Sequence, residues 1–138
     1  MTVFVDSSVW FAAVFAKDAG HARAIKILED EAPALLTTDH IIVETWLLLK
    51  NRSNQAAAEE YCQRMMGGWC RIEAATNEDL QAAETIRSAF LDQKFSLVDR
   101  TSFVVMERLG LARVASFDND LSIYRYGANR DLAFEVLR

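Results

Sequence analysis

Val3-Phe4-Val5-Asp6-Ser7-Ser8 opens the chain with three apolar residues, one acid and two serines. A short continuous apolar run is typical of a strand that is buried on both faces of a parallel sheet. The serines and the apolar segment 9–15 that follows them predict a capped helix directly after the strand. Asp6 would then lie at the carboxyl end of a central strand, where open α/β folds bind their ligands.

The length and composition predict one folded domain over residues 1–138. Hydrophobic residues make up 51% of the sequence and there are only one proline and five glycines, so a sizeable core can form and no long linker is visible. The net charge of −5 argues against a broad basic surface for duplex nucleic acid. It leaves room for nucleic acid at a site where metal ions neutralise acids, since two divalent cations would raise −5 to −1.

Three features predict a cytoplasmic protein with no membrane segment. Cys62 and Cys70 form neither a CxxC motif nor a disulfide framework, which favours reduced thiols. The first apolar run follows Met1 without the basic segment of a secretory signal. The most apolar stretch, residues 41–49, is interrupted by Glu44 and is too short to cross a bilayer.

Short apolar segments alternate with longer segments of helical periodicity along the whole chain. After the first strand, further strands are expected at 34–37, 70–73, 112–116 and 133–136. Helices are expected at 8–17, 21–31, 40–52, 55–66, 77–93 and 97–110, with a short helix or turn up to residue 127. This alternation predicts parallel crossovers and a three-layer α/β/α domain.

Four acids occupy positions from which they can converge. Asp6 and Asp118 each follow a predicted strand, Glu44 interrupts an apolar helix, and Asp99 lies in the first turn of its helix. Like charges about 4 Å apart repel by roughly 4 kcal/mol at intermediate dielectric, so such a cluster needs bound cations or raised pKa values. Oxygen ligands suit Mg²⁺ or Mn²⁺, and a metal held in this way can activate water against a phosphodiester.

Each acid also has a structural alternative, and Glu44 is the acid that structure alone explains least easily. Asp6 could only cap the helix that follows it, and Asp99 and Asp118 are ordinary residues at helix starts and turns. Among the basic residues, Lys50, Arg52, Arg100 and Arg108 could hold RNA phosphates, although ordinary solvated charges are the more common role. The apolar residues around Phe103, Val104 and Leu109 could pack against a second subunit.

Four segments in a fixed order resemble the motifs of PIN domains, and in particular of the short VapC-like toxins of bacterial toxin–antitoxin pairs. The segments are Val5-Asp6-Ser7-Ser8-Val9-Trp10, Val43-Glu44-Thr45, Leu97-Val98-Asp99-Arg100-Thr101-Ser102-Phe103 and Ala115-Ser116-Phe117-Asp118-Asn119-Asp120. Each motif is weak alone, and the ordered set over the whole chain is fairly specific.

This resemblance implies a five-stranded parallel sheet in the order 3-2-1-4-5 and an Mg²⁺-dependent endoribonuclease. It implies an RNA substrate, an antitoxin as protein partner, and a homodimer. Asp6, Glu44, Asp99 and Asp118 match the metal-binding acids of the family. Ser8, and Thr101 or Ser102, match hydroxyl positions that hydrogen-bond around the acids, and Asp120 is a spare acid ranked below Asp118.

Other functions remain open on the sequence. A PIN-domain nuclease could process or degrade RNA without an antitoxin. A receiver-like phosphoacceptor domain also gathers acids around Mg²⁺, but it needs an Asp after the third strand and a Lys after the fifth. The third predicted strand ends in Glu73 and no lysine follows Lys94, which disfavours this class. A non-catalytic metal-binding module is expected if the acids do not meet.

Overall fold

The computed structural model describes residues 1–138, which form five strands and seven helices. The strands are β1 (Val3–Val5), β2 (Leu35–Thr38), β3 (Arg71–Glu73), β4 (Arg113–Ala115) and β5 (Glu135–Leu137). The helices are α1 (Ser7–Val14), α2 (His21–Glu31), α3 (Asp39–Arg52), α4 (Gln55–Met66), α5 (Asn77–Ala89), α6 (Leu97–Leu109) and α7 (Asp120–Ile123).

All five strands are parallel and form one sheet in the order β3-β2-β1-β4-β5. This order confirms the expected 3-2-1-4-5 topology, with β1 at the centre. It also argues against the receiver-like alternative, because receiver domains have the order 2-1-3-4-5.

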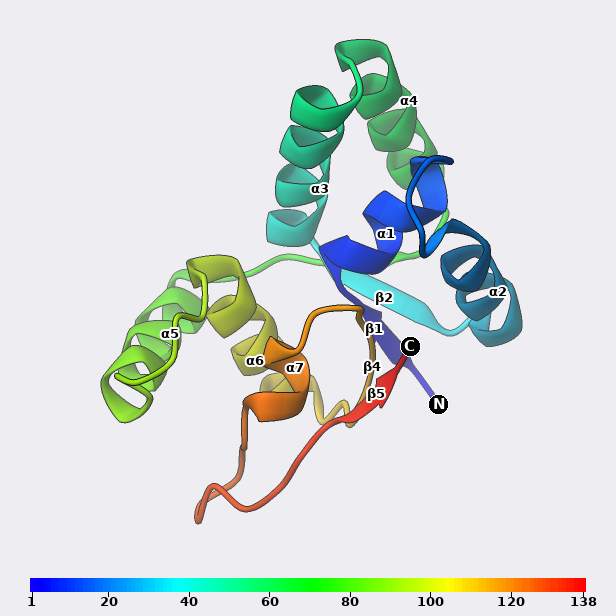
Figure 1. Ribbon diagram of the computed structural model, residues 1–138. Helices are drawn as coiled ribbons and strands as arrows, with labels where there is room; N and C mark the ends of the chain where they lie inside the picture. The colour runs from blue at the N-terminus through cyan, green and yellow to red at the C-terminus, as the bar shows by residue number, and fades with distance from the viewer.

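The helices cover the two faces of the sheet in two groups (Figure 1). The chain moves from β1 outward to β3, then returns across β1 to β4 and β5. Because parallel crossovers are right-handed, reversing the direction of travel places the later helices on the opposite face. Figure 1 accordingly shows α1–α4 above and to the right of the sheet and α5–α7 together at its lower left.

The change of direction at β1 creates the position for a ligand. β1 pairs with β2 on one side and with β4 on the other, and Val5 is in register with Ala115. The two residues after these strand ends, Asp6 and Ser116, therefore lie side by side at the carboxyl edge of the sheet. In open α/β sheets, ligands bind in the crevice at this kind of switch point.

The central strand is buried as expected, and two helices end earlier than the sequence predicted. Val3, Phe4 and Val5 are fully buried, as the apolar run predicts. α1 ends at Val14 rather than at residue 17, because the chain becomes extended at Phe15, whose ring packs on the Phe11 ring. Similarly, α5 ends at Ala89 rather than at residue 93.

Of the three residues expected at a subunit contact, Phe103 cannot take part, whereas Val104 and Leu109 are partly exposed. The Phe103 side chain is fully buried, and its ring stacks on the Tyr124 ring with 4.1 Å between the centroids. Phe103 therefore belongs to the core between α6 and the carboxyl-terminal segment and cannot contact a second copy. None of the helices combines the length and hydropathy needed to span a bilayer.

Candidate active site

Asp6 turns its carboxylate into the fold instead of capping α1. It occupies the N-cap position of α1, yet its side chain makes no capping hydrogen bond. Its Oδ2 instead accepts hydrogen bonds of 2.9 Å from both Ser8 Oγ and Ser116 Oγ. The side chain is 4% exposed, so this pair of hydroxyls fixes an almost fully buried acid.

Glu44 reaches the same region from α3. Ser7 at the start of α1 donates a hydrogen bond to Glu44 Oε1, which ties the helix that follows β1 to the helix that follows β2. Glu44 is only partly exposed although its neighbours on the helix are mostly apolar. The acid therefore points inward from an apolar helix, and Ser7 is its hydrogen-bond donor.

Asp99 is held by the amino-terminal end of α6. Ser96 and Asp99 form a capping box in which Ser96 N donates to Asp99 Oδ2 and Asp99 N donates to Ser96 Oγ, both at 3.0 Å. This reciprocal pair fixes the carboxylate without using Asp99 Oδ1. This Ser-x-x-Asp pattern is visible in the sequence. It would have predicted the orientation of the Asp99 carboxylate, which a position in the first turn of a helix does not.

Two further acids complete the group from the segment after β4. Asp120 N donates to Asp118 Oδ1 at 3.0 Å, and Asp118 N donates to Ser116 Oγ at the same distance. Carboxylate oxygens of Asp99, Asp118 and Asp120 all lie within 4.8 Å of one another. Asp120, ranked below Asp118 on the sequence, thus lies as close to Asp99 as a shared cation requires.

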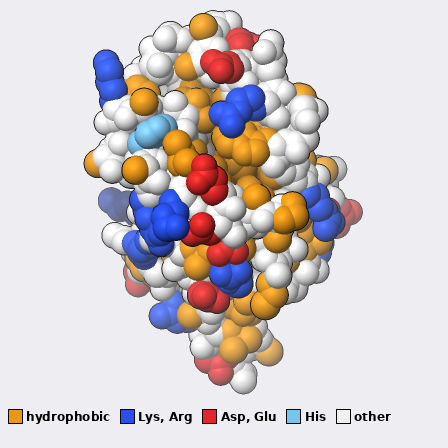
Figure 2. All heavy atoms as spheres, turned by 90° about the vertical axis from the view of Figure 1, so that its right-hand side faces the viewer, with side chains coloured by type: hydrophobic (Ala, Val, Ile, Leu, Met, Phe, Trp, Pro, Cys, Tyr) orange, Lys and Arg blue, Asp and Glu red, His pale blue; other side chains and the backbone are white.

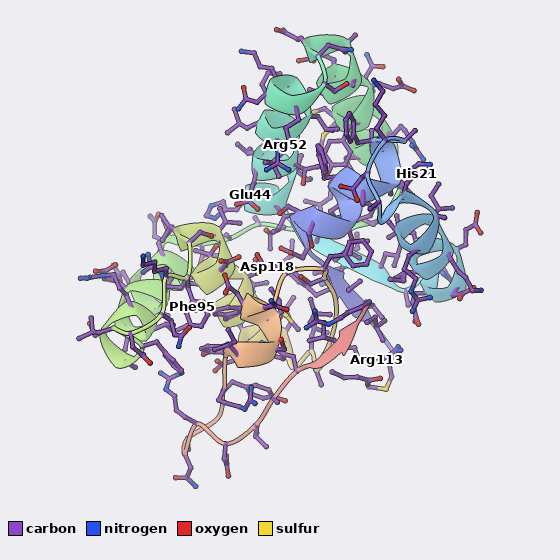
Figure 3. All side chains as sticks on the ribbon, viewed as in Figure 1. His21, Glu44, Arg52, Phe95, Arg113 and Asp118 are labelled. Atoms are coloured by element: carbon purple, nitrogen blue, oxygen red, sulfur yellow. The ribbon has the colours of Figure 1, made fainter.

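All five acids line one cleft with a volume of about 540 Å³. Figure 3 shows Glu44 on α3 and Asp118 before α7 close together in this view. The cleft contains a sixth acid, Asp18, which the sequence analysis did not single out, and two basic residues, Arg52 and Lys94. Acids that are separated by most of the chain length therefore meet where β1 and β4 end.

The electrostatic environment penalises ionisation of three of these acids. Burial raises the pKa of Asp6 and of Glu44, although serine hydrogen bonds oppose the shift, and nearby acids raise both further. Burial raises the pKa of Asp99 to about 7; the backbone hydrogen bond from Ser96 opposes the shift, and neighbouring acids, including Asp118, reinforce it. The cleft therefore gathers more negative charge than its own cations balance.

The donor set fits a hard divalent cation. Every candidate ligand is a carboxylate oxygen, which suits Mg²⁺ or Mn²⁺ and does not suit zinc. In Glu44, Asp99 and Asp118, one oxygen accepts a hydrogen bond from the protein and the other accepts none. A bound cation would use the free oxygens and would remove the repulsion that raises the pKa values.

The expected hydroxyl support is found only in part. Ser8 hydrogen-bonds Asp6 at 2.9 Å, as the resemblance implies. Thr101 instead donates to Val98 O at 3.0 Å, and Ser102 Oγ is buried without a partner, so neither hydrogen-bonds an acid. Ser7 and Ser116 make the acid contacts that had been expected from α6, and sequence separation hid both: they lie 37 and 110 residues from their partners.

Two of the four basic candidates for phosphate binding are already paired. Arg100 is buried and donates to Ala83 O and Glu84, which corrects the expectation of a solvated or RNA-binding side chain. Arg108 pairs with Asp79 at 2.9 Å and with Glu73 at 3.2 Å. Lys50 lies over the Trp46 ring at 5.7 Å and does not line the cleft. Of the four candidates, only Arg52 lines the acidic cleft.

Comparison with known proteins bears directly on this geometry. The sequence pattern of the PIN domain family matches residues 3–127. The chain belongs to the PIN domain family. This PIN domain protein is 32% identical over 120 residues to the "23S rRNA-specific endonuclease VapC20" of Mycobacterium tuberculosis, covering 87% of this chain and 92% of the relative.

Two solved structures are also similar to this chain. The crystal structure of M. tuberculosis VapC20, described as a "Sarcin-Ricin loop cleaving toxin", superposes with a TM-score of 0.82 at 31% identity, covering 86% of this chain and 92% of that one. A toxin–antitoxin complex from Klebsiella pneumoniae has a TM-score of 0.65 at 13% identity over 99% and 97% of the two chains, which shows a shared fold. This PIN domain protein is a VapC homologue and an RNA endonuclease.

Nucleases of this family depend on metal ions, and the acidic group of the cleft meets that requirement. The four acids that match the family's motifs line one cleft. The roles of the individual acids belong to the proposal that follows.

Proposed function

We propose that the protein is an Mg²⁺-dependent endoribonuclease and the toxin of a toxin–antitoxin pair, acting on RNA in the cytoplasm. The observation that carries the proposal is the convergence of Asp6, Glu44, Asp99 and Asp118 in one cleft at the switch point of the sheet, with Asp120 beside Asp99 and Asp118. Mn²⁺ is expected to substitute, because it prefers the same oxygen ligands.

The chain's own groups hold the acids in position for this chemistry. Ser8 and Ser116 fix Asp6, Ser7 fixes Glu44, and the cap of α6 fixes Asp99. When bound, the cation supplies Lewis-acid stabilisation of the phosphodiester and a water of lowered pKa. Asp120, whose carboxylate lies within 4.8 Å of both Asp99 and Asp118, is a further candidate ligand.

The sarcin–ricin loop of 23S rRNA is the first substrate to test, because the relative VapC20 is a 23S rRNA-specific endonuclease and a sarcin–ricin loop cleaving toxin. Purified protein is incubated with ribosomes in Mg²⁺ or in EDTA, and the cleavage ends in total RNA are mapped. The proposal predicts new ends that require Mg²⁺ and are lost in Asp6→Asn. Cleavage that is equally fast in EDTA, or in a folded Asp6→Asn protein, would contradict it.

An antitoxin is the proposed protein partner, and the molecule offers an apolar groove for it. Ala13, Ile25, Leu28 and Trp69 line a hollow of about 390 Å³ between α1, α2 and the end of α4. Figure 2 shows hydrophobic side chains gathered in a hollow on this face, with acidic and basic side chains scattered around it. Growth arrest on expression, relieved by a small protein encoded next door, tests this role; normal growth would favour an RNA-processing nuclease.

A homodimer is proposed through the exposed apolar side of α3 and the start of α6, in place of the buried Phe103. Val43, Leu47 and Leu97 are 59%, 48% and 48% exposed. Val43 and Leu47 line an apolar hollow of about 370 Å³ together with Leu48 and Val98. Sedimentation of wild type and Leu47→Glu tests this: the wild type is expected to be a dimer and the variant a monomer.

A further inference from the structure

Arg52 and Lys94 are the two basic residues that line the acidic cleft. Both side chains are exposed, and neither lies within 4.0 Å of a carboxylate oxygen, although six acids share the same cleft. Other basic side chains of the protein, among them Arg100, Arg108 and Arg113, are committed to ion pairs with acids elsewhere. Two exposed cations without an ion pair at an acidic cleft are available to bind an anionic ligand.

Arg52 is fixed on the wall formed by α1 and α3. It lies in the last turn of α3, eight residues after Glu44, which corresponds to about 12 Å along the helix axis. Its guanidinium lies over the Phe11 ring, 5.5 Å from the centroid, and Phe11 itself lines the cleft. Contact with the aromatic ring orients a guanidinium and leaves its N–H edge free for bidentate binding to a phosphate.

Lys94 enters the cleft from the other side. It lies in the connection between α5 and α6, two residues before Ser96, which caps α6. Lys94 lines the same cleft as Arg52. In Figure 3, Glu44 and Asp118 lie between Arg52 on α3 and the ribbon of α5 and α6, whose connection carries Lys94. The acids that would hold the metal are thus bracketed by one basic residue on each wall.

We propose that Arg52 and Lys94 each hold an RNA backbone phosphate, one on either side of the scissile phosphate at the acids. The inference rests on the proposed nuclease function and names the residues that position its substrate. Arg52 offers a planar, oriented pair of donors, and Lys94 offers a mobile point charge. Because phosphates carry no sequence information, both residues set affinity and placement and not sequence preference.

The test measures RNA affinity and cleavage separately. A fluorescent single-stranded RNA is titrated onto protein carrying Glu44→Gln, which prevents cutting, and onto the same protein with Arg52→Ala, Arg52→Lys or Lys94→Ala added. Lys50→Ala controls for Arg52, because Lys50 is exposed on the same turn but lies over Trp46 outside the cleft. Lys17→Ala, an exposed lysine outside the cleft lining, controls for Lys94.

Arg52→Ala and Lys94→Ala are each expected to weaken RNA binding about tenfold, the order expected for one lost hydrogen bond to a charged group. Each should reduce the salt dependence, the slope of log affinity against log salt, by about 0.7, as for one phosphate of a single strand. Arg52→Lys should retain the wild-type slope, since it keeps the charge. The active forms of the alanine variants should show raised KM with kcat changed far less.

Alanine variants that bind RNA like the two lysine controls, with an unchanged salt slope, would overturn the inference. A loss of kcat with unchanged affinity would also overturn it, because that pattern indicates a structural or catalytic role. The result is separable from the proposed function. If the wild type cleaves no RNA while the affinity losses occur as expected, the phosphate contacts stand and the nuclease proposal fails.

Discussion

Two aspartates in this protein have the same local structure and opposite electrostatic environments. Asp79 and Asp99 both occupy the third position of a capping box, at the starts of α5 and α6, and both are nearly buried, at 2% and 8% exposure. Burial opposes ionisation of each. At Asp79, hydrogen bonds and charge from Arg108, with the hydrogen bond from Thr76, outweigh burial and lower the pKa below its usual range. At Asp99, other acids add to burial and raise the pKa to about 7.

The difference shows what distinguishes a structural acid from a functional one. A capping box explains the presence of either aspartate equally well, so helix capping cannot be the full role of Asp99. Asp79 is neutralised by the chain itself, whereas Asp99 faces Asp6, Asp118 and Asp120 and lacks a cation of the protein. A charge that the fold leaves unbalanced is a site for an ion from solution.

Exchanging each aspartate for asparagine should separate the two roles, with the largest effect on activity at Asp99. Asp99→Asn keeps an oxygen that can accept from Ser96 N, so the cap and the fold should persist. Cleavage should fall by at least about a hundredfold, because losing a residue that only supports a metal ligand already costs about 10–100-fold. Asp79→Asn is the matched control and should cleave RNA like the wild type. The initial rates of RNA cleavage in Mg²⁺ are measured for both variants. A wild-type rate in a folded Asp99→Asn protein would show that Asp99 is not part of the active site.

The two acids should also give stability opposite dependences on pH in metal-free protein. The raised pKa of Asp99 contributes stability at acid pH that is lost as pH rises from about 4 through 7, with a slope of up to about 1.4 kcal/mol per pH unit for one proton. The raised pKa values of Asp6 and Glu44 act in the same direction. The lowered pKa of Asp79 contributes stability that is present above its ordinary value and lost on acidification below it.

Urea unfolding in EDTA between pH 5 and pH 8 measures this dependence. The wild type should lose stability as the pH rises, and Asp99→Asn should lose less. A wild-type stability that increases across this interval would mean that the acids do not repel one another as their positions imply.

On stability at neutral pH, Asp79→Asn should have the larger effect of the two asparagine variants. It removes the charged partner of Arg108 from a buried position, which should lower the free energy of unfolding by about 1–3 kcal/mol. Because Arg108 is itself 36% exposed, the low end of this interval is expected. Asp99→Asn should leave the stability equal or higher, because it removes repulsion. A larger loss of unfolding free energy in Asp99→Asn than in Asp79→Asn would mean that Asp99, and not Asp79, is the acid that the fold neutralises.

The smallest effect is expected at the hydroxyl that joins Asp6 to the loop after β4. Ser116 Oγ donates to Asp6 and accepts from Asp118 N, so Ser116→Ala leaves both acids in place but less firmly oriented. Loss of an outer partner of a metal ligand typically costs tenfold or somewhat more in activity. Ser122→Ala is the control and should be unchanged, because the Ser122 hydroxyl donates to Asn119 O and accepts from Arg138 and bonds none of the acids.

The central strand, the helix caps and the candidate acids could be predicted from the sequence, because each depends on a local pattern. The apolar run at β1 predicts its burial, and Thr76 and Asn54, which cap α5 and α4, are residue types typical of helix caps. The sheet order followed from the family resemblance. Contacts between distant segments could not be read in this way: nothing local pairs Ser7 with Glu44.

The errors have a related cause. Arg100 looked like a solvated charge because its partners, Ala83 O and Glu84, belong to another helix. Phe103 looked available to a second subunit because the segment that buries it, around Tyr124, lies in the irregular carboxyl-terminal part of the chain. The rank of Asp120 below Asp118 stays a prediction, since the carboxylates of both lie within 4.8 Å of Asp99.

The central claim is that a divalent cation from solution balances the acids around Asp99, and a thermal melt at pH 8 tests it most directly. Melting temperatures of wild type and Asp99→Asn are compared in EDTA and in saturating Mg²⁺. The wild type should be stabilised by about 2–3 kcal/mol when Mg²⁺ exceeds its dissociation constant a hundredfold, and the variant by much less. Equal melting temperatures of the wild type with and without Mg²⁺ would contradict the account.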